Sequence, residues 1–163
     1  MKKSKGRMSV LALCLLAASC QSPVTPSVPL NDLLTAPLAV EINGRQFTLE
    51  TYLWRDFMPG SAPPDGSLLG AVVYLTAVDG QPFPAETDSN RIWVVNGEEV
   101  WETTFLSEAR PRDSVHLYQL QKNASGGPRW DVGAQVEVVV RVTVSTAAPC
   151  LLRATKQVIG RTD

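Results

Sequence analysis

The sequence has little of the chemistry on which most enzymes and metal sites depend. It contains one histidine, His116, although histidine is the usual general base at neutral pH and a frequent zinc ligand. His116 falls in an expected strand, where a surface or edge position is its ordinary role. The sequence also lacks a Gly-Lys-Ser/Thr phosphate loop, a Gly-x-Ser-x-Gly nucleophile turn and a dinucleotide fingerprint. These absences favour a protein that is not an enzyme and that has no cofactor and no metal site.

Cysteine and long apolar runs are scarce as well. Of the three cysteines, Cys14 and Cys20 lie at the N-terminus. Cys150 is then left without an intrachain partner, and we expect a small buried hydrophobe rather than a disulfide. The uncharged stretch 8–19 is shorter than the roughly 20 apolar residues that a membrane-spanning helix needs. It therefore argues against an uncleaved membrane span.

The N-terminus reads as an export signal. Residues 1–7 hold four basic residues and no acid, and an apolar segment follows, which is typical of a secretory signal peptide. That segment ends in Ala17-Ala18-Ser19-Cys20, which resembles the lipobox of bacterial lipoproteins. The resemblance implies cleavage of a signal peptide at 1–19 and attachment of a lipid to the Cys20 thiol. It covers only residues 1–20, and Ala17 stands where the lipobox most often has leucine. The same small residues also fit ordinary signal cleavage.

A lipid on Cys20 would place the protein in the cell envelope with the membrane as a partner. Either the outer membrane or the outer face of the cytoplasmic membrane is consistent, and Gln21 in place of aspartate favours the outer membrane. The leader takes four of the 15 basic residues and none of the 16 acids, so the remainder carries a formal charge of −5. A net negative charge argues against a nucleic-acid partner.

Residues 20–37 begin at the lipobox cysteine and contain four prolines among serine and threonine. This composition predicts an extended, lipid-anchored tether that rises about 3.1 Å per residue. The Asn-Asp-Leu-Leu patch inside it is expected to form at most one helical turn. The folded domain is then predicted to span residues 38–163.

The rest of the chain has the pattern of β-strands. Asn43-Gly44 predicts a two-residue hairpin turn, in which Val40 faces Phe47 and Glu41 faces Gln46. Asn96-Gly97 predicts a second hairpin, with Val95 and Glu98 flanking the turn and Arg91 opposite Glu102. Further strands are expected at 69–78, 114–121, 135–145 and 150–159.

These elements predict an all-β fold, because no stretch keeps a helical period. The expected architecture is a two-sheet antiparallel β-sandwich, immunoglobulin-like, with about seven or eight strands. The cysteine–tryptophan–cysteine hallmark of true immunoglobulin domains is absent. One domain accounts for the whole β-rich region, which is long enough to bury a core.

Four tryptophans are the most suggestive residues. Trp101 is predicted to lie in the core, and Trp130 is predicted to fold back and cap one end of the sandwich. Trp54, Trp93 and Trp130 are the candidate partner-binding residues, because exposed flat rings commonly serve recognition. We therefore expect a non-catalytic, lipid-anchored module that contacts an envelope protein or a glycan.

Two alternatives remain open from the sequence. The first is an envelope hydrolase that uses the carboxylates Glu98, Glu99 and Glu102, although Glu98 and Glu102 share a strand face that Glu99 does not. The second is an inhibitor of a secreted hydrolase.

Overall fold

The computed structural model describes residues 27–60, 62–110, 117–145 and 147–163. Cys20, the rest of the lipobox and His116 lie outside the described residues. Within them one short helix, α1 (Leu30–Thr35), precedes nine strands, so the all-β prediction is confirmed. The strands are β1 (Ala39–Ile42), β2 (Arg45–Asp56), β3 (Leu69–Ala77), β4 (Thr87–Asn96), β5 (Glu99–Thr103), β6 (Ser107–Ala109), β7 (Gln119–Gly127), β8 (Gln135–Val144) and β9 (Ala147–Thr162).

All nine described strands join one mixed sheet rather than two separate ones. Its order is β5-β4-β8-β9-β2-β3-β7-β6, with β1 also paired to β2. The long strand β9 pairs antiparallel with β8 over most of its length and then parallel with β2 from Ile159 onward. Lys156 lies just before this change of partner and has a φ of 54°. The expected pair of antiparallel sheets is therefore not confirmed, because β9 connects both halves through its backbone.

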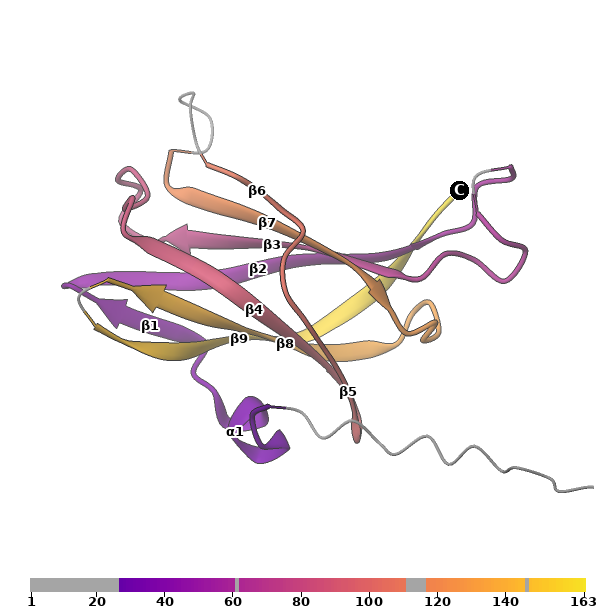
Figure 1. Ribbon diagram of the computed structural model, residues 1–163, viewed down its shortest axis with the longest axis horizontal. Helices are drawn as coiled ribbons and strands as arrows, with labels where there is room; N and C mark the ends of the chain where they lie inside the picture. Colours follow the sequence, from indigo (N-terminus) through magenta and orange to yellow (C-terminus); the bar gives the residue numbers. More distant parts are fainter. Residues whose placement is uncertain (1–26, 61, 111–116, 146) are drawn as a thin grey trace, which may run out of the picture.

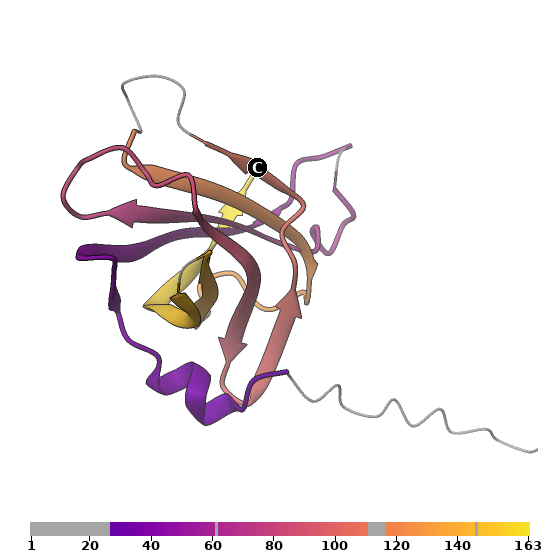
Figure 2. The same cartoon turned by 60° about the vertical axis from the view of Figure 1, so that its left-hand side comes forward.

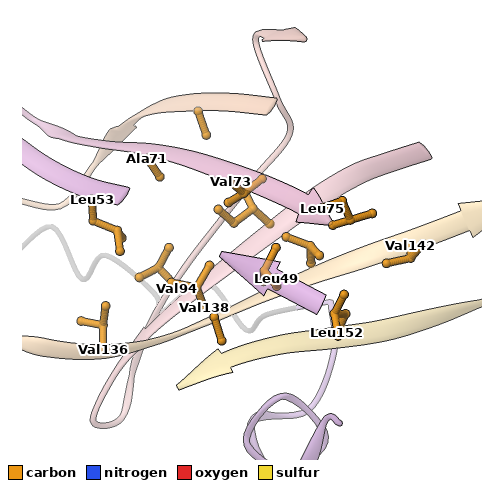
Figure 3. Close-up of a cluster of buried hydrophobic side chains, with 14 of the residues drawn as sticks. Leu49, Leu53, Ala71, Val73, Leu75, Val94, Val136, Val138, Val142 and Leu152 are labelled. Carbon is orange, nitrogen blue, oxygen red and sulfur yellow. The ribbon is translucent and has the colours of Figure 1, made fainter. Parts of the chain in front are cut away.

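The sheet curls so that its two halves face each other (Figures 1 and 2). Strands β1, β2, β3, β6 and β7 form one half, and β4, β5 and β8 form the other. The main core lies between them, where Leu53 and Val73 from one half approach Val94 and Val138 from the other (Figure 3). Alternate valines of β8 all point into this core, as the period of two in the sequence predicts: Val136, Val138, Val140, Val142 and Val144.

The first hairpin is confirmed in turn and in register. Val40 pairs with Phe47 and Glu41 pairs with Gln46. Asn43 and Gly44 have φ values of 51° and 75°, which is the left-handed pair that a type I′ turn requires.

The predicted register of the second hairpin is wrong by two residues. Asn96 pairs with Glu99, so the turn consists of Gly97 and Glu98. Of these two, only Gly97 has a positive φ, 62°, as in a type II′ turn with glycine first. Asn96 can therefore stay in the ladder, and a shift of two residues leaves every side chain on its expected face. Arg91 still forms an ion pair with Glu102, now across a diagonal.

The folded unit begins before residue 38, which corrects part of the predicted tether. Residues 27–37, here called the strap, run across the outer face of the half that contains β4 and β8. Leu33 and Ala36 of the strap are 0% and 5% exposed and pack on Trp93, Val95 and Val139. A six-residue helix is not stable alone in water, and α1 has no side-chain N-cap. Docking on the sheet therefore holds the helix in place.

Candidate functional site

Two stacked aromatic rings lie on the outer face of β2. The ring centroids of Tyr52 and Trp54 are 5.5 Å apart with an angle of 19° between the planes. Strand alternation directs both side chains away from the core, because Leu53 between them is buried. Tyr52 is 50% exposed. We call this surface the aromatic face.

A glycine on the neighbouring strand β3 leaves room for the Trp54 indole. The backbone partners of Trp54 are Gly70 on β3 and Gly160 on β9. A Cβ atom on Gly70 would lie 2.7 Å from Cζ2 of Trp54, which is too close for any side chain. The indole therefore occupies the space beside Gly70 that a larger side chain would fill, and it forms a flat surface on the sheet. The sequence predicted Trp54 as a candidate but not its contact with Gly70, because a long loop rather than a tight turn joins β2 to β3.

Polar side chains continue this face across β3 and β7. Asn123 is next to Val72, the neighbour of Tyr52, and Ser125 is next to Gly70. The Asn123 amide Nδ2 donates a hydrogen bond to Ser107 Oγ at 2.9 Å. Amides and hydroxyls both donate and accept hydrogen bonds, so the aromatic face has directional groups beside its rings.

Arg55 fixes the end of β2 next to this face. Arg55 is buried, with 6% of the residue exposed. Arg55 Nε donates to the Ser67 carbonyl at 2.9 Å, and Nη1 donates to the Trp130 carbonyl at 3.2 Å. One side chain thus ties the 57–68 loop to the loop that carries Trp130. No sequence pattern indicates this role, because all of these acceptors are backbone carbonyls.

Trp93, the second candidate binding residue, lies beneath the strap. Its side chain is 0% exposed, and the Arg141 guanidinium lies 5.2 Å from its ring centroid. Cross-strand position places Trp93 on the outer face of β4, but the strap covers that face. In this conformation Trp93 offers no ring surface to a partner.

Trp130, the third candidate, closes one end of the curled sheet. It is 8% exposed and belongs to the main core, and its Nε1 donates a hydrogen bond to the Glu99 carboxylate. An open hollow of about 530 Å³ lies between the β4–β5 turn and the Trp130 loop. Trp130 therefore packs into the core, as the cap predicted from the sequence would, and it also lines the hollow. Trp101 is in the core as expected.

The three carboxylates of the second hairpin do not converge. Glu98 and Glu99 line the hollow, whereas Glu102 lies on the opposite face of β5 beside the strap. There it accepts hydrogen bonds from Ser27 N at 2.7 Å and Ser27 Oγ at 2.6 Å. Glu102 therefore holds the strap and takes no part in the hollow.

Glu102 has a pKa of about 2. Partial burial alone would raise this pKa, but hydrogen bonds from Ser27 and Arg91 outweigh that effect. Both partners favour the ionised carboxylate.

This low pKa predicts how the strap responds to acid. Because the folded pKa lies below the ordinary value of 4.5, the contribution of Glu102 to stability is complete above pH 4.5 and is lost as the pH falls toward 2. Glu102→Gln should therefore lower the free energy of unfolding by about 1–3 kcal/mol at pH 7. Denaturant unfolding of both proteins at a series of pH values measures the difference, which should shrink steadily below pH 4.5. A constant difference at every pH would contradict this role.

The described residues contain few other groups of chemical interest. Among them no three or more histidine, cysteine or acidic residues are placed to hold a metal ion. Partial burial raises the pKa of the Cys150 thiol, as expected for a packing residue. No helix in the described ranges is long and apolar enough to span a membrane. Comparison with known proteins gave no match to a family model, a curated protein or a solved structure.

Proposed function

We propose that this protein is a lipid-anchored envelope protein whose β-sheet domain binds a glycan without chemical turnover. The observation that carries the proposal is the stacked pair of Tyr52, which is half-exposed, and Trp54, which is partly exposed and packs over Gly70. The export signal and the lipobox resemblance supply the location. Binding of this kind needs no histidine, metal or cofactor.

A glycan suits the aromatic face better than a protein partner does. Sugar rings have an apolar face of C–H groups that packs on flat aromatic rings, and their edges carry hydroxyls. The aromatic face combines stacked rings with the amide of Asn123 and the hydroxyl of Ser125 on the same side of the sheet. Neutral amides and hydroxyls match sugar hydroxyls in both donating and accepting roles.

Replacement of Trp54 by alanine tests the aromatic face. We expect Trp54→Ala to weaken binding to purified, insoluble envelope glycan by about five- to thirtyfold, because loss of one stacking ring costs about 1–2 kcal/mol. Co-sedimentation with the glycan measures the affinity. The matched control is Leu106→Ala, since Leu106 is a 70% exposed hydrophobic residue on the β5–β6 connection, and it should leave binding unchanged.

Two outcomes would count against a binding face at Trp54. One is equal binding by wild type and Trp54→Ala. The other is release of soluble sugar fragments that stops in Glu98→Gln or Glu99→Gln, which would support the hydrolase alternative at the hollow instead.

The anchor has its own test. Cells grown with an alkyne fatty acid should label the wild-type protein, and Cys20→Ser should abolish the label because the acceptor thiol is gone. The control Cys150→Ser should label as strongly as the wild type. Release of unlabelled wild-type protein into the medium would refute the anchor.

A further inference from the structure

The strap brings the folded domain close to the proposed lipid. Ser27 is held by two hydrogen bonds to Glu102, and the Arg153 backbone N–H and Nε bond to the Pro37 and Ala36 carbonyls. Both ends of the strap are thus attached to the sheet. Only residues 21–26 separate Cys20 from Ser27. Even a fully extended chain spans at most about 25 Å from Cys20 to Ser27, so the half of the sheet that carries the strap must stay near the bilayer.

The same half presents groups that suit a membrane surface. Leu34 on α1 and Leu38 directly after the strap are 37% and 51% exposed. On the sheet beside the strap, Arg91 and Arg141 are direct cross-strand partners. Like charges in that arrangement repel each other. Arg91 is paired with Glu102, whereas Arg141 forms no ion pair with any carboxylate of the described residues and contacts the Trp93 ring instead.

A cation in this position is complementary to an anionic headgroup. The rest of the mature chain is acidic, so a general attraction to anionic lipid is not expected. Arg141 is a local exception, and a guanidinium is well suited to phosphate because its donors form a planar fork.

We infer that the outer face of β4, β8 and β9, with the strap across it, lies against the bilayer that holds the Cys20 lipid, and that Arg141 contacts phospholipid headgroup phosphate there. This inference rests on the lipid anchor of the proposed function. The strap lies on one side of the curled sheet, and β2 and β3 lie on the other (Figures 1 and 2). The aromatic face is then directed away from the membrane, toward polymer in the envelope space.

Site-specific fluorescence on the lipidated full-length mature protein tests this orientation. Single probes are attached in a Cys150→Ser background at Leu34→Cys, on the strap, and at Glu50→Cys, on the outer face of β2. The protein is reconstituted in vesicles of phosphatidylethanolamine and phosphatidylglycerol with a headgroup spin-labelled lipid. We expect strong quenching of the probe at residue 34 and little at residue 50. Equal quenching of both probes would overturn the orientation.

Charge reversal tests the headgroup contact. Each basic residue near an anionic surface contributes about fivefold to its occupancy, so Arg141→Glu should reduce docking about thirtyfold and remove most of the quenching at residue 34. The control is Arg161→Glu, the same change in a 50% exposed side chain. It should retain the quenching, because Arg161 lies past the corner at Lys156, on the part of β9 that pairs with β2. Full quenching in Arg141→Glu would refute the contact. Mass spectrometry of the same preparation reports acylation of Cys20, so failure of the anchor is distinguished from failure of the orientation.

Discussion

Trp93→Ala is expected to lower the free energy of unfolding by about 3–5 kcal/mol, the usual cost of removing a large buried aromatic side chain. Trp93 is 0% exposed and lies between the sheet and the strap. The truncation leaves a cavity beneath Leu33, and it also removes the ring that the Arg141 guanidinium contacts. Because α1 has no stability of its own, the strap should loosen together with the core.

Denaturant unfolding and hydrogen exchange measure this effect. We expect the amide of Leu33 to lose protection in Trp93→Ala, since strap docking depends on the ring. Trp54→Ala is the matched control: Trp54 is partly exposed on the other half of the sheet, and its loss should change stability far less while weakening glycan binding. If Trp93→Ala unfolds like the wild type, the docked strap described above is incorrect.

Lys122→Met is expected to lower the free energy of unfolding by about 2–3 kcal/mol, because it removes the cation from a semi-buried charge cluster. Lys122 on β7 is 8% exposed at its side chain. Its ammonium lies 2.7 Å from Asp88 Oδ1 on β4 and forms an ion pair with it, although the geometry is not that of a hydrogen bond. The same ammonium donates a hydrogen bond to Glu108 on β6. Strands β4 and β7 belong to opposite halves and share no backbone ladder. This cluster therefore links the two halves where the curled sheet remains open.

Removal of the lysine leaves two nearby carboxylates with only Arg110 between them. Arg110 lies 3.6 Å from Asp88 and 3.3 Å from Glu108, farther from each carboxylate than the Lys122 ammonium does. The carboxylates are 42% exposed, so solvent reduces the cost below that of a fully buried pair. Lys156→Met changes an exposed lysine at the corner of β9 and is the control, with little expected effect.

The pH dependence of the stability difference between wild type and Lys122→Met gives a second test of this cluster. The hydrogen bond from Lys122 lowers the pKa of Glu108. A lowered folded pKa contributes stability that is present above the ordinary carboxylate pKa and is lost as the pH falls through the folded value. The difference between wild type and Lys122→Met should therefore be largest at neutral pH and smaller in acid. Thermal unfolding at several pH values checks this, and a difference that grows in acid would contradict it.

Much of the local structure could be predicted from the sequence. The Asn43-Gly44 hairpin, the valine strand β8 and the end of β3 at Asp79-Gly80 all follow from neighbouring residues, because turn chemistry and alternation act over a few positions. The second hairpin shows where such reasoning is limited. Gly97 permits two turn types, and the predicted Arg91–Glu102 ion pair is compatible with both registers.

The fate of the tryptophans could not be predicted, because burial depends on what covers a face. Trp93 and Trp54 both occupy outward positions on strands. The strap covers Trp93, whereas Tyr52 is half-exposed and Trp54 is partly exposed. The strap itself has the composition of a linker, and only its contacts with the sheet order it.

The sequence alone thus determined the all-β class, the first hairpin and the alternation of each long strand, since these depend on contacts between near neighbours. The tertiary structure decided that β9 joins both halves into one curled sheet, that residues 27–37 belong to the folded unit and that Trp54 rather than Trp93 remains accessible. These features arise from contacts between residues far apart in the chain, whose entropic cost and packing energy leave no local pattern.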